Sequence, residues 1–203
     1  MPIATRSALR SRWLNPVALA RQAFPSNQII LTKYFTAALP PSPSDLTQAA
    51  RQQVYWRALR ALGNVEIIEG HFRVRQVWAP VAQPPPDMMR IIRHEEKGSD
   101  INMASHLLAD GFTGRYDAAI VISGDSDFMT PVRMVREVVG RPVGVLNPQR
   151  ISGPASRPIR NSAGLRQAAS FYQNGVTWNQ LVRAQLPLVL SDSAGPIHRP
   201  PEW

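Results

Sequence analysis

Residues 118–128, AAIVISGDSDF, are the segment that decides the fold. A continuous apolar run is typical of a strand that helices cover on both faces, as in a parallel sheet. Gly124 indicates a tight turn, and a predicted helix begins at Phe128 and ends at Gly140. In open α/β sheets, ligands bind outside the carboxyl ends of the strands. Asp125 and Asp127 therefore stand where chemistry is expected.

Two aspartates, Asp125 and Asp127, lie two residues apart in this turn. Neighbouring carboxylates repel each other unless a cation neutralises them. Hard oxygen ligands of this kind suit Mg²⁺ or Mn²⁺. Aspartate also shapes turns and caps helices, but one cap accounts for only one of the two residues. We therefore favour a metal site over a purely structural turn.

Outside this segment, strand and helix patterns alternate along the chain, which predicts an α/β fold whose mostly parallel sheet is covered on both faces. We assign residues 1–185 to one domain, and the proline-rich residues 186–203 to a C-terminal surface or disordered tail. The other predicted elements are helices at 16–23, 45–62 and 100–110, strands at 28–35, 88–94 and 142–146, and two short strands, 65–68 and 72–78, around a glycine turn.

Composition narrows the function classes. The chain of 203 residues has no cysteine, which excludes disulfides, thiolate metal sites and cysteine nucleophiles. The formal net charge is +9, with the acids concentrated in the middle and basic flanks on either side, which is typical of a protein that binds a polyanion. No apolar run approaches the roughly 18 residues that cross a bilayer, so we expect no membrane partner and a cytoplasmic location.

A second acidic segment, EEKGSDIN at residues 95–102, precedes the strand by about one helix. Gly98 and Ser99 predict a helix start, which places Asp100 in the first turn. An acid there also complements the helix dipole, so this segment alone is uninformative. Together with the strand-end pair it supplies the third carboxylate that a metal site needs.

Three motifs, KGSDIN at 97–102, YD at 116–117 and SGDSDF at 123–128, resemble the signature of NYN domains, which are LabA-like members of the PIN-like nuclease superfamily. The resemblance covers about residues 7–200. It implies a Rossmann-like, three-layer α/β/α fold and divalent-metal-dependent hydrolysis of single-stranded or structured RNA. The metal-binding and catalytic acids would be Asp100, Asp125 and Asp127, and the groups that support them or contact the phosphate would be Lys97, Asn102, Ser123 and Ser126.

The pattern departs from the family at its beginning. Family members open with a central strand that ends in Asp-x-x-Asn, whereas here only six residues precede the start of the resemblance at Ser7. We expect the first strand and its acid to be absent, which could leave this form inactive. A start upstream of Met1 is favoured over degeneration.

Two other functions are alternatives to a nuclease. A dehalogenase-like phosphatase needs an early strand-end Asp-x-Asp, which this chain lacks. A catalytically degenerate RNA-binding or interaction module remains the alternative, because the basic flanks would serve it equally well. The sequence leaves open whether the chain forms a homo-oligomer.

Overall fold

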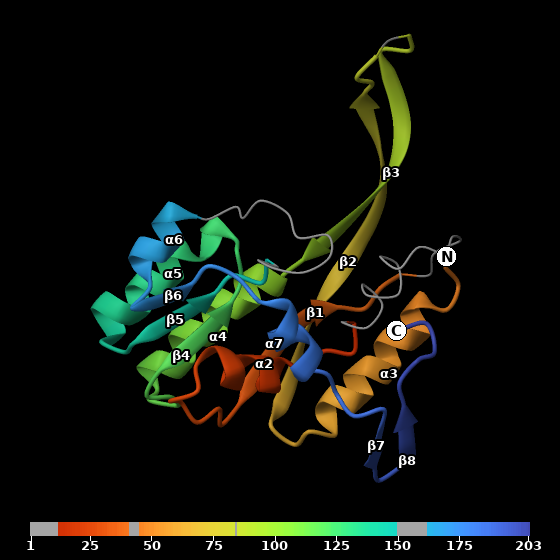
Figure 1. Ribbon diagram of the computed structural model, residues 1–203. Helices are drawn as coiled ribbons and strands as arrows, with labels where there is room; N and C mark the ends of the chain where they lie inside the picture. The colour runs from red at the N-terminus through yellow and green to blue at the C-terminus, as the bar shows by residue number, and fades with distance from the viewer. Residues whose placement is uncertain (1–11, 41–44, 84, 150–161) are drawn as a thin grey trace.

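The computed structural model describes residues 12–40, 45–83, 85–149 and 162–203, and Figure 1 shows their arrangement. Its elements are α2 (Pro16–Ala23), β1 (Thr32–Ala37), α3 (Gln48–Arg60), β2 (Val65–Pro80), β3 (Met88–Lys97), α4 (Ser99–Phe112), β4 (Ala119–Ile122), η1 (Ser126–Phe128), α5 (Met129–Met134), η2 (Val135–Val139), β5 (Val143–Leu146), α6 (Ala163–Ala168), β6 (Phe171–Gln173), α7 (Trp178–Arg183), β7 (Val189–Asp192) and β8 (Gly195–His198). The predicted α/β class is confirmed.

The strands form two sheets with parallel pairs, and a separate hairpin. β4, β5 and β6 are parallel, in the order β4-β5-β6. β1 pairs with β2 in parallel, and β3 joins the far edge of β2 in the antiparallel direction. Among the described residues, no ladder joins β1 to β4, so the sheet predicted as one is hydrogen-bonded as two.

Helices cover both faces of these strands. On β4, Ala119 and Val121 pack in a cluster with residues of α4 and α5, whereas Ile120 and Ile122 pack against α2 and α7. β1 likewise lies between two helices. Its Lys33 forms an ion pair of 2.5 Å with Asp110 of α4, and its Tyr34 packs in the cluster that contains Tyr55 of α3. This arrangement is compatible with a three-layer α/β fold.

The helix predicted at 128–139 is divided into three parts. A short 3₁₀ turn, η1, leads into α5, and the last five residues, η2, are π-helical. The segment still ends at Gly140, whose φ of 73° favours glycine. The longest described helix, α4, has 14 residues, and no helix among the described residues is long and apolar enough to cross a bilayer.

A long antiparallel hairpin projects from the body (Figure 1). We call residues 71–80 of β2 and 88–97 of β3 the arm; its pairs run from His71 opposite Lys97 to Pro80 opposite Met88. The prediction of two short strands around a glycine turn was wrong, because β2 is continuous. Gly70 is needed there for a close approach: a Cβ would lie 2.7 Å from the Lys97 carbonyl oxygen.

The C-terminal residues also differ from the prediction. The segment 186–203, predicted as a surface or disordered tail, forms the hairpin β7–β8, in which Ile197 is buried against α3. The Arg57 guanidinium donates to the Asp192 carboxylate at 2.6 and 2.7 Å, which ties the hairpin to α3. Trp203 stacks edge-on against Trp13. The segment is therefore ordered and contributes Leu186 and Ile197 to the core, while most of its other side chains lie at the surface.

The predicted absence of the first strand concerns residues 1–11 and the chain before them. Residues 1–11 lie outside the part of the chain that the structure describes. That prediction therefore stays a prediction.

Candidate functional site

The turn after β4 is held by hydrogen bonds within its own residues. The Ser123 hydroxyl accepts from the Asp125 N–H at 3.1 Å, and the Asp125 carboxylate accepts from the Asp127 N–H at 3.0 Å. A Cβ on Gly124 would lie 3.1 Å from the amide oxygen of Asn147, so glycine keeps the turn close to the end of β5. Asp125 is thus the cap of η1, and the turn stands at the carboxyl end of the parallel sheet.

Asp127 has no structural task of this kind. Its side chain is exposed, and within the described residues its carboxylate has no hydrogen bond or ion pair. The next residue, Phe128, is only 2% exposed and anchors the turn in the core. The two aspartates therefore differ: one shapes the turn, and the other presents a free carboxylate to solvent.

Asp100 lies at the start of α4 and interacts electrostatically with this turn. Gly98, with a φ of 94°, precedes the helix and allows the chain to leave β3 sharply. Asp100 is exposed, but desolvation by the atoms around it raises the pKa of its carboxyl group, and the negative charges of Asp125, Glu96 and Asp127 raise this pKa further. The three predicted acids are therefore close enough for their charges to interact.

Glu96 is an additional acid that the sequence analysis did not single out. Its carboxylate accepts a hydrogen bond from the Ser99 hydroxyl, and it has no ion pair among the described residues. Residues 96–101 line a pocket of about 300 Å³ where the arm meets α4. Strand alternation would have placed Glu95 and Glu96 on opposite faces of β3, which was the available signal.

The remaining predicted residues are placed as follows. The Lys97 ammonium lies 3.2 Å from the Glu95 carboxylate, so it is directed toward that partner. The Asn102 N–H donates to the Gly98 carbonyl at 2.7 Å as part of the first turn of α4. Ser126 is exposed at the start of η1. Their contact with a phosphate stays a prediction.

The four acids of this site, Asp100, Asp125, Asp127 and Glu96, are chemically suited to bind a hard divalent cation. All four acids offer carboxylate oxygens, and their mutual repulsion at Asp100 is of the kind that a cation relieves. Within the described part of the chain, however, no three acidic, histidine or cysteine side chains stand close enough together to hold one ion. The chemistry of the acids is suitable, and their spacing is wider than that of a closed metal site.

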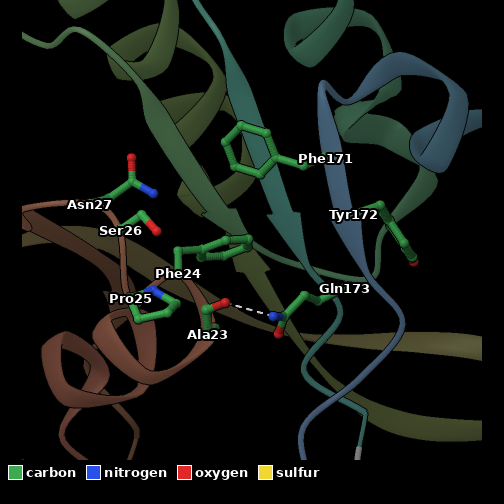
Figure 2. A pocket seen from close by; sticks show the side chains of 8 residues that line it. All are labelled: Ala23, Phe24, Pro25, Ser26, Asn27, Phe171, Tyr172 and Gln173. Atoms are coloured by element: carbon green, nitrogen blue, oxygen red, sulfur yellow. Dashed lines mark hydrogen bonds between the residues drawn. The ribbon is translucent and has the colours of Figure 1, made fainter.

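Another pocket, of about 350 Å³, lies between the end of α2 and the edge strand β6. Figure 2 shows its lining side chains and the hydrogen bond of 2.6 Å from the Gln173 amide to the Ala23 carbonyl. The Phe24 and Phe171 rings lie 5.4 Å apart. None of the lining residues is a carboxylate, histidine, lysine or arginine, so this pocket offers no charged side chain to a ligand.

The NYN domain family matches residues 5–164. The chain belongs to the NYN domain family. The match includes the arm, α4 and the whole acidic turn, so this NYN domain has a nuclease-like fold.

Two further proteins are similar to this NYN domain. The 6-hydroxy-3-succinoylpyridine 3-monooxygenase HspA of Pseudomonas putida is 28% identical over 182 residues. That match covers 84% of this chain but only 56% of the relative, so the chain spans little more than half of the relative's length. A crystal structure of a Vibrio parahaemolyticus protein of unknown function matches with a TM-score of 0.47 and 18% identity, over 81% of this chain and 78% of that one.

Proposed function

We propose that this NYN domain is a divalent-metal-dependent ribonuclease that hydrolyses RNA phosphodiesters. The observation that supports this most directly is the turn at the end of β4, in which Asp125 accepts the Asp127 N–H and the Asp127 carboxylate has no partner within the described residues; the charges of both acids, and of Glu96, act on Asp100 at the start of α4. Acids that destabilise one another at a strand-end site are typical of functional sites. The net charge of +9 favours a polyanionic substrate.

The residues that would hold Mg²⁺ or Mn²⁺ are Asp100, Asp125 and Asp127, and to bind one ion together their carboxylates would have to approach more closely than they do in this structure. Such an ion supplies positive charge that polarises a phosphate and activates water for attack. The contributions of the chain itself are local. Asp125 fixes the turn through its bond to the Asp127 N–H, which leaves the Asp127 carboxylate free.

The alternative is an RNA-binding or interaction module without cleavage. It shares the basic surface but does not need the free carboxylate of Asp127. The relative from Pseudomonas putida is named a monooxygenase. It is 28% identical and the match covers 56% of its length, so we do not assign its activity to this chain.

The test is cleavage of end-labelled single-stranded and hairpin RNA with Mn²⁺, Mg²⁺ or EDTA. We expect Asp100→Asn, Asp125→Asn and Asp127→Asn each to abolish metal-dependent cleavage. The matched control is Asp117→Asn: Asp117 is fully exposed and lies before the opposite end of β4, with an ion pair of 3.4 Å to Arg141. This variant should cleave like the wild type. Unchanged cleavage by Asp125→Asn would refute the site, and absence of any wild-type cleavage would favour the binding module.

A further inference from the structure

The arm is the feature that the proposed active site leaves unexplained. Its side chains are largely exposed, although several are large and apolar. A two-stranded ribbon is marginally stable in water on its own, and exposed apolar patches mark interaction sites. The arm therefore has the properties of a surface that a ligand covers.

Strand register separates the arm into two faces, because residues directly opposite in an antiparallel pair share a face. On one face, Arg73 lies opposite Glu95 and Arg75 opposite Arg93, and Lys97 follows. Three cations share the single Glu95 carboxylate: Arg75 and Arg93 lie 3.1 Å from it, and Lys97 lies at 3.2 Å. This face thus carries four cations and one acid. We call it the basic face.

The opposite face presents an exposed aromatic side chain. Trp78 is 66% exposed and lies directly opposite Arg90. Val74 and Ile92, 51% and 63% exposed, stand on the same face. Neither Arg90 nor Arg73 has a hydrogen bond or ion pair within the described residues, so both guanidinium groups are free for a ligand.

The arm leads directly into the acidic site. Its last residues, Glu96 and Lys97, line the pocket that also contains Asp100. A ligand that lies along the arm would therefore reach the carboxylates at its foot. Figure 1 shows the arm leaving the body beside the start of α4.

We propose that the arm binds a single-stranded RNA that crosses from one face of the ribbon to the other. Toward the tip, Trp78 stacks on a base and Arg90 contacts a phosphate; nearer the body, Arg73 on the basic face contacts a second phosphate. This rests on the proposed function and assigns the surface that guides the substrate to the site. Exposed aromatic rings and arginines are the elements that bind unpaired bases and backbone. The major groove of duplex RNA is too narrow for a ribbon, so a single strand fits. A second copy is disfavoured because both copies carry a net charge of +9.

The test measures binding in EDTA, where metal-dependent cleavage cannot occur, by fluorescence anisotropy of a labelled single-stranded RNA. We expect the double variant Arg73→Glu/Arg90→Glu to bind at least tenfold more weakly. Its slope of log affinity against log salt should be shallower by about 1.4, or about 0.7 for each lost phosphate contact. The control is Arg166→Glu/Arg183→Glu, which changes the same charge at exposed positions of α6 and α7. It should retain the wild-type slope to within about half that change.

Tryptophan emission tests the stacking contact separately. Trp13 and Trp56 are each 1% exposed, Trp178 and Trp203 are half-buried outside the arm, and Trp78 is 66% exposed, so Trp78 should account for most of the quenching by bound RNA, and Trp78→Phe should lose that part. Trp78→Ala should weaken binding about 5- to 150-fold, the range expected for one stacked base. Phe112→Ala, which removes a 60% exposed ring at the end of α4, is the matched control and should bind as the wild type.

The outcomes separate this proposal from the nuclease proposal. Arm variants that bind as the wild type, or a wild type that does not bind RNA in EDTA, would overturn the role of the arm whether or not RNA is cleaved. Light scattering that shows dimers, lost on reversal of the arm charges, would assign the arm to a second copy instead. Weaker binding by the arm variants supports the proposal even if cleavage is never observed.

Discussion

Alanine and asparagine substitutions at Asp125 and Asp127 should separate the structural from the chemical role of the acidic turn. Asp125 accepts the Asp127 N–H at 3.0 Å, whereas the Asp127 carboxylate has no partner within the described residues. Alanine at Asp125 removes a cap, and asparagine keeps it because an amide oxygen caps equally well. At Asp127 neither substitution removes a bond.

The expected magnitudes follow from this difference. Loss of a cap costs about 1 kcal/mol, within a range of roughly 0.5–2 kcal/mol. In a chain of this size, 1 kcal/mol lowers the melting temperature by about 2–4 °C. In EDTA we therefore expect Asp125→Ala to melt about 2–4 °C below the wild type. Asp125→Asn, Asp127→Asn and Asp127→Ala should lie within about 0.5 kcal/mol of it or slightly above.

Addition of metal should separate the wild type from the variants that lack a ligand. A ligand at one hundred times its dissociation constant stabilises the folded state by about 2.7 kcal/mol, which corresponds to roughly 5–10 °C here. We expect Mn²⁺ to raise the melting temperature of the wild type by this amount and to raise that of Asp127→Asn much less. The assay is thermal unfolding followed by circular dichroism, with and without Mn²⁺.

Two results would refute this reasoning. If Asp127→Ala in EDTA is as destabilised as Asp125→Ala, the Asp127 carboxylate has a structural partner. If Mn²⁺ stabilises Asp127→Asn as strongly as the wild type, the free carboxylate is not a metal ligand. Asp117→Asn serves as the control for a general effect of removing one charge.

Three further predictions concern other groups. The Arg57 guanidinium holds the pKa of Asp192 at about 2. The stability from this pair is therefore present above about pH 3.8 and is lost as the pH falls through about 2. In an acid melting series, the difference in melting temperature between the wild type and Asp192→Asn should shrink over that interval. The pKa of Asp100 is raised, so its ionised form destabilises the fold at neutral pH. Asp100→Asn should therefore melt at a higher temperature than the wild type at pH 7 in EDTA, and this difference should disappear as the pH falls through the raised pKa. A lower melting temperature for Asp100→Asn at pH 7 would contradict this account. Phe128→Ala should lower the free energy of unfolding, measured in urea, by about 3–5 kcal/mol, because Phe128 is 2% exposed. A decrease of less than about 1 kcal/mol would show that Phe128 does not anchor the turn.

Local patterns predicted the central strand and the turn. The apolar run before Gly124 has few alternatives to a buried strand, and β4 covers residues 119–122. Asp125 and Asp127 follow it directly, so their position at the strand end came from the sequence alone. The first-turn position of Asp100 was likewise visible from Gly98 and Ser99.

Features set by distant contacts could not be predicted in this way. Gly70 looked like a turn residue, but its neighbour in space is the Lys97 carbonyl, 27 positions along the chain. Glu96 depends on the pairing of β3 with β2 and on its bond to Ser99. The burial of Ile197 depends on α3, which no pattern in the tail itself reveals. Local propensity is informative only where tertiary packing does not decide the outcome.

The aromatic contacts between the two ends of the described chain constrain the order in which the protein can mature during synthesis. The Trp13 indole donates to the Pro187 carbonyl across 174 positions, and Trp203 packs on both Trp13 and Tyr55. On a translating ribosome, the half of the molecule around α3 must wait, with its apolar side chains uncovered, until the β7–β8 hairpin has left the exit tunnel. Closing so long a loop is slow, which lengthens the interval during which these apolar side chains are open to aggregation.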